Sequence, residues 1–245
     1  MTIPLVQVVR HADENDLATR SAQRLLESLI ALQADGHTPQ LCLAGGRAAM
    51  AVYAEFAKLI PDSDLDTTRL ELWWSDERFL PTDDPERNAG PALALLASAF
   101  SIDPARTHPM PSADGTIDAG ASAALYAKEL GDTTFDICLL GMGPDGHVAS
   151  IFPDHPSSEP ANQPVIGVSD APKPPPERIS LTVARINTSA QVWLLVHGAD
   201  KSAAVARALG EDLSLPAARV AGRERTLWLV DEESAAQLPY FVCTG

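Results

Sequence analysis

The chain has 245 residues, of which 45% are hydrophobic, and a formal net charge of −15 from 18 Lys and Arg against 33 Asp and Glu. This length and apolar content suffice for a globular α/β fold with its own core and exclude a disordered chain. The acidic balance, with no run of basic residues, argues against nucleic acid or an anionic membrane as a partner.

Three features of the sequence predict a cytoplasmic protein. The N-terminus, MTIPLVQVVRHADEND, lacks the basic leader and long apolar segment of a signal peptide. The longest apolar segment, PALALLASAF, is too short to span a bilayer. The three cysteines, Cys42, Cys138 and Cys243, are widely spaced, which predicts buried reduced thiols rather than disulfides or a zinc site.

Short strand-like runs alternate with helical patterns along the chain. The predicted strands cover residues 3–9, 40–43, 69–74, 135–140, 191–196 and 226–230. The predicted helices cover residues 13–34, 48–59, 88–100, 117–130 and 200–209. A segment with eight prolines, 153–176, is expected to be an extended connection within the domain rather than a linker. This alternation predicts one α/β domain over residues 1–245, with a doubly wound, mostly parallel sheet and helices on both faces.

Glycine and charged residues follow four of the predicted strands. The segments are Ala44–Arg47, Asp76–Arg78, Gly141–His147 and His197–Lys201. Because ligands of doubly wound sheets bind at the carboxyl ends of the strands, we expect these four segments to share one rim.

Several of these residues are suited to binding an anion. Gly45 and Gly46 precede a helix, whose free N–H groups attract anions, and Arg47 offers a guanidinium for phosphate. Arg78 is a candidate for holding an oxyanion, with Asp76 or Glu77 fixing its orientation. Lys201 either reaches into solvent or neutralises an anion at the rim. An ordinary turn and a solvated loop remain alternatives for the first two segments.

The glycines of FDICLLGMGPDGHVASIFP have the spacing G-x-G-x-x-G. A dinucleotide-binding turn is disfavoured, because no long helix fits before Pro153 and no acidic residue ends a following strand at the required distance. His147 instead becomes a candidate general base at a strand end. His197 is its only rival, since the other histidines lie in polar or proline-flanked segments.

Other kinds of active site find no support in the sequence. No His, Cys or carboxylate group has metal-ligand spacing, and no G-x-S-x-G elbow of a serine hydrolase is present. We therefore expect neither a metal nor a cofactor.

Five blocks resemble the 6-phosphogluconolactonase family, within a superfamily that includes glucosamine-6-phosphate deaminase/isomerase. They are LAGG, WWSDERFLPTDDPERNAG, FDICLLGMGPDGHVASIFP, PKPPPERISLT and VHGADKSAAVARAL, in the family's order from Leu43 to Leu209. The resemblance implies a doubly wound fold and hydrolysis of 6-phosphoglucono-1,5-lactone in the pentose phosphate pathway.

The resemblance also implies roles for individual residues. It makes His147 the catalytic base, Arg78 and Lys201 phosphate ligands, and Gly45 and Gly46 backbone contacts to the ligand. Arg178 matches a family arginine and is expected to bind substrate. The family's hydroxyl residues around the glycine pair are replaced here by Ala44, Arg47 and Ala48, so that Arg47 is a candidate substitute. Asn88 is carried over as a helix cap, and Arg87 is expected to lie on the surface.

The expected mechanism needs no covalent nucleophile, because a δ-lactone is a reactive ester. His147 would deprotonate a water and return the proton to the ring oxygen, with Asp145 orienting the imidazole. Arg47, Arg78, Arg178 and Lys201 would make a positive pocket on a negative protein.

Two rival functions are weighed. A glucosamine-6-phosphate deaminase resembles this chain but has a glutamate five residues after the histidine, where this chain has Phe152. A non-catalytic sugar-phosphate regulator would usually carry a DNA-binding module, for which the sequence has no candidate. The expected partner is a small phosphorylated sugar lactone, with no nucleic acid or membrane partner, and the protein is expected to be a monomer or weak homodimer.

Overall fold

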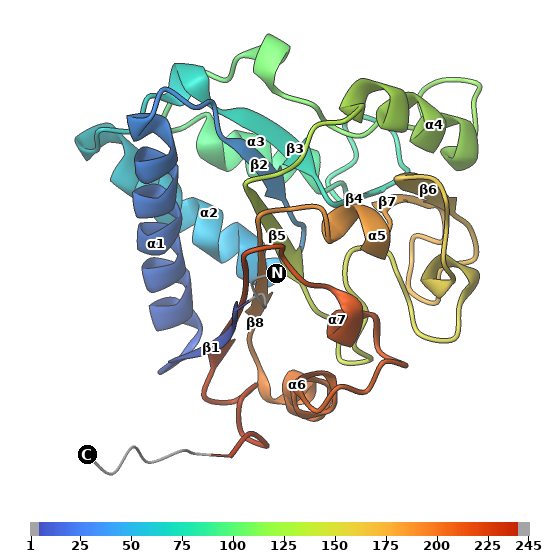
Figure 1. The fold of residues 1–245 in the computed structure, drawn as a ribbon. Coiled ribbons are helices and arrows are strands. Elements are labelled where there is room, and N and C mark those ends of the chain that lie inside the picture. Colours follow the sequence, from blue (N-terminus) through green and yellow to red (C-terminus); the bar gives the residue numbers. More distant parts are fainter. Residues whose placement is uncertain (1–4, 240–245) are drawn as a thin grey trace.

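A six-stranded parallel sheet forms the centre of the molecule (Figure 1). The computed structural model describes residues 5–239 of the chain. The strand order is β1-β9-β8-β5-β2-β3, and every neighbouring pair is parallel. The strands are β1 (Leu5–His11), β2 (Gln40–Leu43), β3 (Glu71–Trp74), β5 (Ile137–Gly141), β8 (Gln191–Val196) and β9 (Arg225–Asp231). The predicted parallel sheet is thus confirmed, although part of the strand predicted from residue 3 lies outside the described residues.

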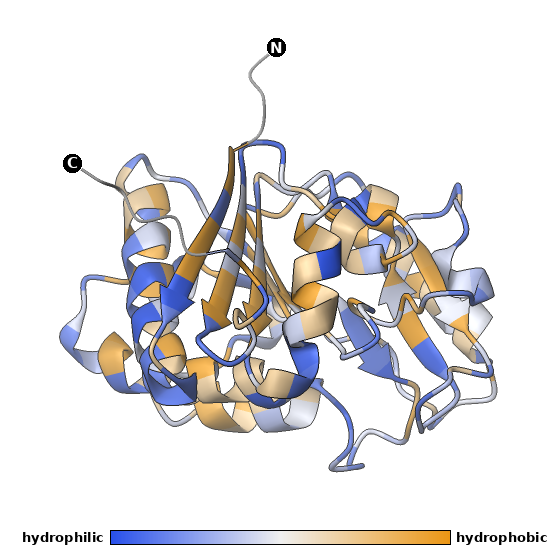
Figure 2. Cartoon of the chain, turned by 90° about the horizontal axis from the view of Figure 1, so that it is seen from below, coloured by the Kyte–Doolittle hydropathy of each residue, from blue (hydrophilic) through white to orange (hydrophobic). Residues whose placement is uncertain are grey.

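Helices cover both faces of this sheet, as predicted (Figures 1 and 2). On one side, α1 (Glu14–Ala34) packs against α2 (Arg47–Leu59), which packs against α3 (Ala89–Leu96). The other side carries α5 (Val183–Ile186), α6 (Ser202–Leu209) and α7 (Pro216–Arg219). Helix α1 begins where the Asp13 side chain accepts a hydrogen bond from the N–H of Asp16.

A second, three-stranded sheet was not predicted. It has the order β4-β7-β6 and consists of antiparallel strands β4 (Asp76–Arg78), β7 (Arg178–Leu181) and β6 (Val165–Val168), with α4 (Ala119–Leu130) packed against β6 and β7. The solvated loop considered for residues 76–78 is instead strand β4, and the segment 153–176 contains strand β6, which the prediction of an extended connection did not identify. Strand β4 has only three residues and no alternating pattern, and its pairing with β7 bridges about a hundred residues of sequence, which local periodicity cannot reveal.

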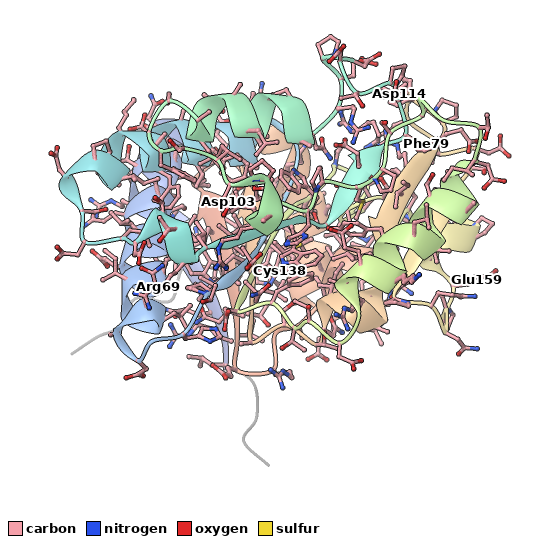
Figure 3. All side chains as sticks on the ribbon, turned by 90° about the horizontal axis from the view of Figure 1, so that it is seen from above. Arg69, Phe79, Asp103, Asp114, Cys138 and Glu159 are labelled. Carbon is pink, nitrogen blue, oxygen red and sulfur yellow. The ribbon has the colours of Figure 1, made fainter. Side chains whose placement is uncertain are left out.

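The core is continuous between the sheet and its helices. Its largest fully buried side chains include Trp74, Trp193, Tyr53 and Tyr126. Cys42 and Cys138 are buried register partners on β2 and β5. Cys138 is labelled in Figure 3, in the interior of the molecule. Both are buried free thiols, as predicted, whereas Cys243 lies outside the described residues. Among residues 5–239, no helix has the length and apolar character needed to cross a membrane.

The order of the strands determines where a ligand can bind. Strand β2 lies between β3 and β5 in the sheet. After β2 the chain forms β3 on one side of it, and later forms β5 on its other side. At such a reversal the loops after the two strands diverge and leave a crevice at their carboxyl ends. Here those loops are the Gly45–Gly46 turn after β2 and the segment around His147 after β5.

Candidate active site

A cavity of about 440 Å³ lies at the carboxyl ends of β2, β5 and β8. Eight of the nine predicted site residues line it: Gly45, Gly46, Arg47, Asp76, Arg78, His147, Arg178 and Lys201. The ninth, Asp145, contacts His147 directly. The four segments that the sequence placed at one rim therefore do meet.

The lining of the cavity is strongly cationic. Five of its residues carry a positive charge, namely Arg47, Arg78, Lys173, Arg178 and Lys201, whereas Asp76 is the only carboxylate that residues 5–239 contribute to the lining. The protein as a whole has a formal charge of −15. Since charges act mainly within a Debye length of about 8 Å, these cations make the cavity locally attractive to an anion.

His147 forms a hydrogen-bonded pair with Asp145 on the cavity wall. Its Nδ1 lies 2.6 Å from Asp145 Oδ1, and Lys173 Nζ lies 3.2 Å from both atoms. Partial burial acts to raise the pKa of Asp145, but the hydrogen bond from His147 and the charges of His147 and Lys173 outweigh it and hold this pKa well below its usual range. An ionised Asp145 accepts the proton on Nδ1, which leaves Nε2 of His147 as the basic nitrogen.

The glycines before His147 make room for it. A β-carbon at Gly143 would overlap the imidazole of His147 and the carboxylate of Asp145. Gly146 has φ +79° and closes the turn by donating its N–H to the carbonyl of Gly143. Val148 then forms isolated bridges with Met142 and Ile151 instead of opening a helix. The G-x-G-x-x-G spacing here therefore supports an imidazole and not a dinucleotide.

The Gly45–Gly46 turn leads into helix α2. Gly46 is the N-cap of α2, has φ +91° and provides no side-chain cap for the first N–H groups of the helix. Gly45 is required for a different reason, because a β-carbon there would collide with the side-chain amide of Asn88. The turn thus presents uncapped N–H groups beside the cavity, which is the arrangement that attracts an anion.

Strand β4 brings Asp76 and Arg78 to the lining of the cavity. The Asp76 carboxylate accepts hydrogen bonds from Ser150 Oγ at 2.7 Å and from Asn88 Nδ2 at 3.2 Å. Arg78 donates through one terminal nitrogen to the carbonyl of Glu86, while its buried Nε has no hydrogen-bond partner. That arginine therefore has an unsatisfied donor beside the cavity.

In the loop after β4, the expectation for Asn88 is confirmed in its position but not in a side-chain cap, and the expectation for Arg87 was wrong. Asn88 is at the N-cap of α3, but its side chain donates to Asp76, and the Glu77 carboxylate accepts the N–H groups of Asn88 and Ala89 instead. Arg87 is buried rather than on the surface, 3.4 Å from Glu77. Burial raises the pKa of Glu77, although these N–H groups and Arg87 act in the opposite direction.

Arg178 and Lys201 complete the predicted set. Arg178 is buried and donates to the carbonyls of Lys173, Pro174 and Pro175, so that it holds the chain beside His147 in place. Lys201 ends a 3-10 turn just before α6, and its ammonium is 2.6 Å from Asp200.

Lys173 was missed by the sequence analysis, although it lies in the block PKPPPERISLT. A lysine in a proline-rich segment resembles a surface residue, and only the tertiary structure brings it to His147. His197, considered as a rival base, lines the same cavity. Within residues 5–239, no three His, Cys, Asp or Glu side chains gather in a way that would hold a metal ion.

Comparisons with known proteins identify the family of this chain. The family model described as glucosamine-6-phosphate isomerases/6-phosphogluconolactonase matches residues 12–228. The chain is 44% identical to a 6-phosphogluconolactonase of Streptomyces coelicolor, over 95% of each chain. It is 38% identical to one of Mycobacterium tuberculosis, over 93% of this chain and 96% of that one. The solved structure of 6-phosphogluconolactonase from Thermotoga maritima superposes with a TM-score of 0.81 at 26% identity, covering 94% of this chain and all of that one. By sequence and by fold, the chain belongs to the family of glucosamine-6-phosphate isomerases and 6-phosphogluconolactonases.

Proposed function

We propose that this chain hydrolyses 6-phospho-D-glucono-1,5-lactone to 6-phospho-D-gluconate, as a cytoplasmic enzyme of the pentose phosphate pathway. The observation that carries the proposal is the His147–Asp145 pair on the wall of a cationic cavity. The names of the relatives reported above support the same substrate.

His147 is the general base of the proposed reaction. Asp145 accepts the Nδ1 proton, so Nε2 is free to take a proton from a water molecule. The water oxygen attacks C1 of the lactone, and the bond between C1 and the ring oxygen breaks when the tetrahedral intermediate collapses. The proton held on Nε2 then passes to the departing ring oxygen. General acid–base catalysis of this kind contributes about 10² to 10⁴ in rate.

The other predicted residues hold the substrate in this proposal. Arg78, Lys201 and Arg47 bind the phosphate together with the backbone N–H groups after Gly45 and Gly46. The unpartnered Nε of Arg78 supports such a role, because a buried donor without an acceptor is costly and gains a partner when an anion binds.

Asp76 and Arg178 have two different roles in this proposal. The Asp76 carboxylate has acceptor capacity beyond the two hydrogen bonds it receives, and in our proposal it accepts one from a sugar hydroxyl. Arg178 acts mainly by holding Lys173 beside His147.

The deaminase alternative is disfavoured by Phe152. This ring is fully buried and lies 4.8 Å from the imidazole of His147, measured between centroids. Phenylalanine has no group that exchanges a proton, so the acid–base partner needed for amino-sugar ring opening is missing. Release of ammonia from glucosamine 6-phosphate would contradict this assignment.

The test is a coupled assay with freshly prepared 6-phosphogluconolactone, corrected for spontaneous ring opening. His147→Ala should lower kcat at least about 100-fold while 6-phosphogluconate still binds. His37→Ala is the matched control, because His37 is exposed and pairs with Asp136 away from the cavity. Turnover of His147→Ala at the parent rate would refute the role of His147.

Two further expectations belong to this proposal. The protein is a monomer or a weak homodimer, and its partner is the sugar lactone rather than nucleic acid or a membrane. Sedimentation at several protein concentrations tests the first.

A further inference from the structure

Three charged or polar side chains from separate elements meet at the edge of the cavity. His197 follows β8, Arg47 opens α2 and Glu14 opens α1. Arg47 Nε lies 3.2 Å from Nε2 of His197. Glu14 approaches both, with one carboxylate oxygen 3.6 Å from Arg47 Nε and the other 3.6 Å from Nδ1 of His197.

His197 is buried and lines the same cavity as Gly46 and Lys201, and it takes no part in the hydrogen bonds that hold His147. The turn from Ala44 to Ala48 has no side-chain hydroxyl, so it offers a bound phosphate only backbone N–H groups and the Arg47 guanidinium. Nε2 of His197 accepts the hydrogen bond from Arg47 Nε, which leaves the N–H on Nδ1 as the side-chain donor that this imidazole can offer a phosphate.

The remaining charged groups near His197 are already engaged. Asp231 accepts hydrogen bonds from the N–H of Gly198 and of Ser234, and Asp200 pairs with Lys201. Glu14 differs from them, because its contacts at 3.6 Å are longer than hydrogen bonds. Glu14 is also not among the residues that line the cavity.

We propose that His197 is a further phosphate ligand of this site, acting with Arg47, and that Glu14 competes with the substrate for these two side chains. The inference rests on the proposed function. In the free protein the Glu14 carboxylate draws Arg47 and His197 toward itself. A dianionic phosphate in the cavity offers them a stronger partner, since the Arg47 side chain is 75% exposed and its pair with Glu14 is therefore weak.

Kinetics with two substrates test the role of His197. His197→Ala should raise KM for 6-phosphogluconolactone about tenfold or more, leave kcat within about twofold, and leave KM for unphosphorylated gluconolactone unchanged. An unchanged KM for the phosphorylated lactone, or a fall in kcat alone, would overturn the proposal. His197→Gln keeps an N–H donor and should recover part of the loss.

The competition is tested by Glu14→Gln, with Glu27→Gln on an exposed position of the same helix as its control. Glu14→Gln should lower KM about two- to fivefold, and this gain should shrink in combination with His197→Ala, because Glu14 then competes for Arg47 alone. A KM that stays the same or rises would overturn the role of Glu14.

A binding measurement separates this inference from the activity itself. Calorimetric titration of 6-phosphogluconate into His147→Ala protein, with and without His197→Ala, measures the phosphate contact without turnover. A tenfold weaker Kd caused by His197→Ala supports the inference even if the lactonase assay fails, and an equal Kd overturns it even if that assay succeeds. Unchanged thermal unfolding of each variant verifies that it is folded.

Discussion

Gly143 and His147 are packed so closely that any side chain at position 143 would overlap the imidazole. Gly143→Ala should therefore displace His147 from Asp145 and lower kcat at least about 100-fold, with a small loss of stability. Gly90→Ala is the matched control, because a β-carbon there has open space within α3 and should leave kcat unchanged. Steady-state assays of both variants measure the effect, and parent activity of Gly143→Ala would mean that the imidazole works from another position.

Lys173 places an ammonium 3.2 Å from both members of the His147–Asp145 pair. A positive charge there favours ionised Asp145 and is one of the causes that hold the pKa of this carboxyl well below its usual range. On acidification, Lys173→Met should therefore lose its activity at a higher pH than the parent does. Lys173→Arg keeps the positive charge and should shift the pH profile part of the way back toward that of the parent. The pH dependence of kcat/KM is the measurement, with Lys58→Met at a surface ion pair as control. A profile that does not move would restrict Lys173 to substrate binding.

Arg78 has a buried Nε without a partner and lines the cavity. Removing its guanidinium should weaken phosphate binding, so Arg78→Ala is expected to raise KM for the phosphorylated lactone about tenfold or more. Arg223→Ala, at an exposed position outside the cavity, should leave KM unchanged. If KM of Arg78→Ala stays at the parent value, Arg78 serves the structure of β4 and not the substrate.

Glu77 is fully buried and accepts N–H groups of Arg78, Asn88 and Ala89. Glu77→Gln loses one acceptor oxygen and the charge facing Arg87, and should lower the free energy of unfolding by about 2 kcal/mol. Glu27→Gln, on the exposed face of α1, should change it by less than about 0.5 kcal/mol. Urea denaturation of both variants gives the values.

The difference in stability between the parent and Glu77→Gln should change with pH in a defined direction. Because burial raises the pKa of Glu77 in the folded state, its contribution to stability is greatest below the unfolded value of about 4.3 and declines as pH rises through the folded value. The stability gap between parent and Glu77→Gln should therefore shrink from pH 4 to pH 7. A gap that widens with pH would show that the N–H groups and Arg87 outweigh burial.

Cys42 and Cys138 are buried neighbours on β2 and β5, and burial raises the pKa of Cys42 well above its usual range. A thiol that stays protonated is a poor nucleophile. In a Cys243→Ser background, Ellman's reagent at pH 8 should find no fast-reacting thiol in the native protein and two after denaturation. Rapid modification of the native variant would show that the sheet opens at its centre.

The central sheet was predictable because each of its strands is a short apolar run between helical patterns, as in QLCL and QVWLLV. The second sheet was not, because DER and RISL pair across about a hundred residues and carry no pattern of their own. Arg87 was misplaced for a different reason, because its partners are near in sequence but the charge alone does not reveal them. Its charge suggested solvent, whereas the structure buries it against Glu77 and the carbonyls of Leu80 and Met110.

The sequence by itself determined the parallel sheet, the rim at its carboxyl ends and the identity of the candidate base, since strand periodicity and glycine spacing are local properties. Only the tertiary structure decided which groups surround that base. Lys173 reaches His147 because Arg178 holds its carbonyl, and His197 meets Arg47 because β8 ends and α2 begins at the same crevice. Such contacts depend on how distant segments pack, and packing geometry is not encoded in the spacing of residues along the chain.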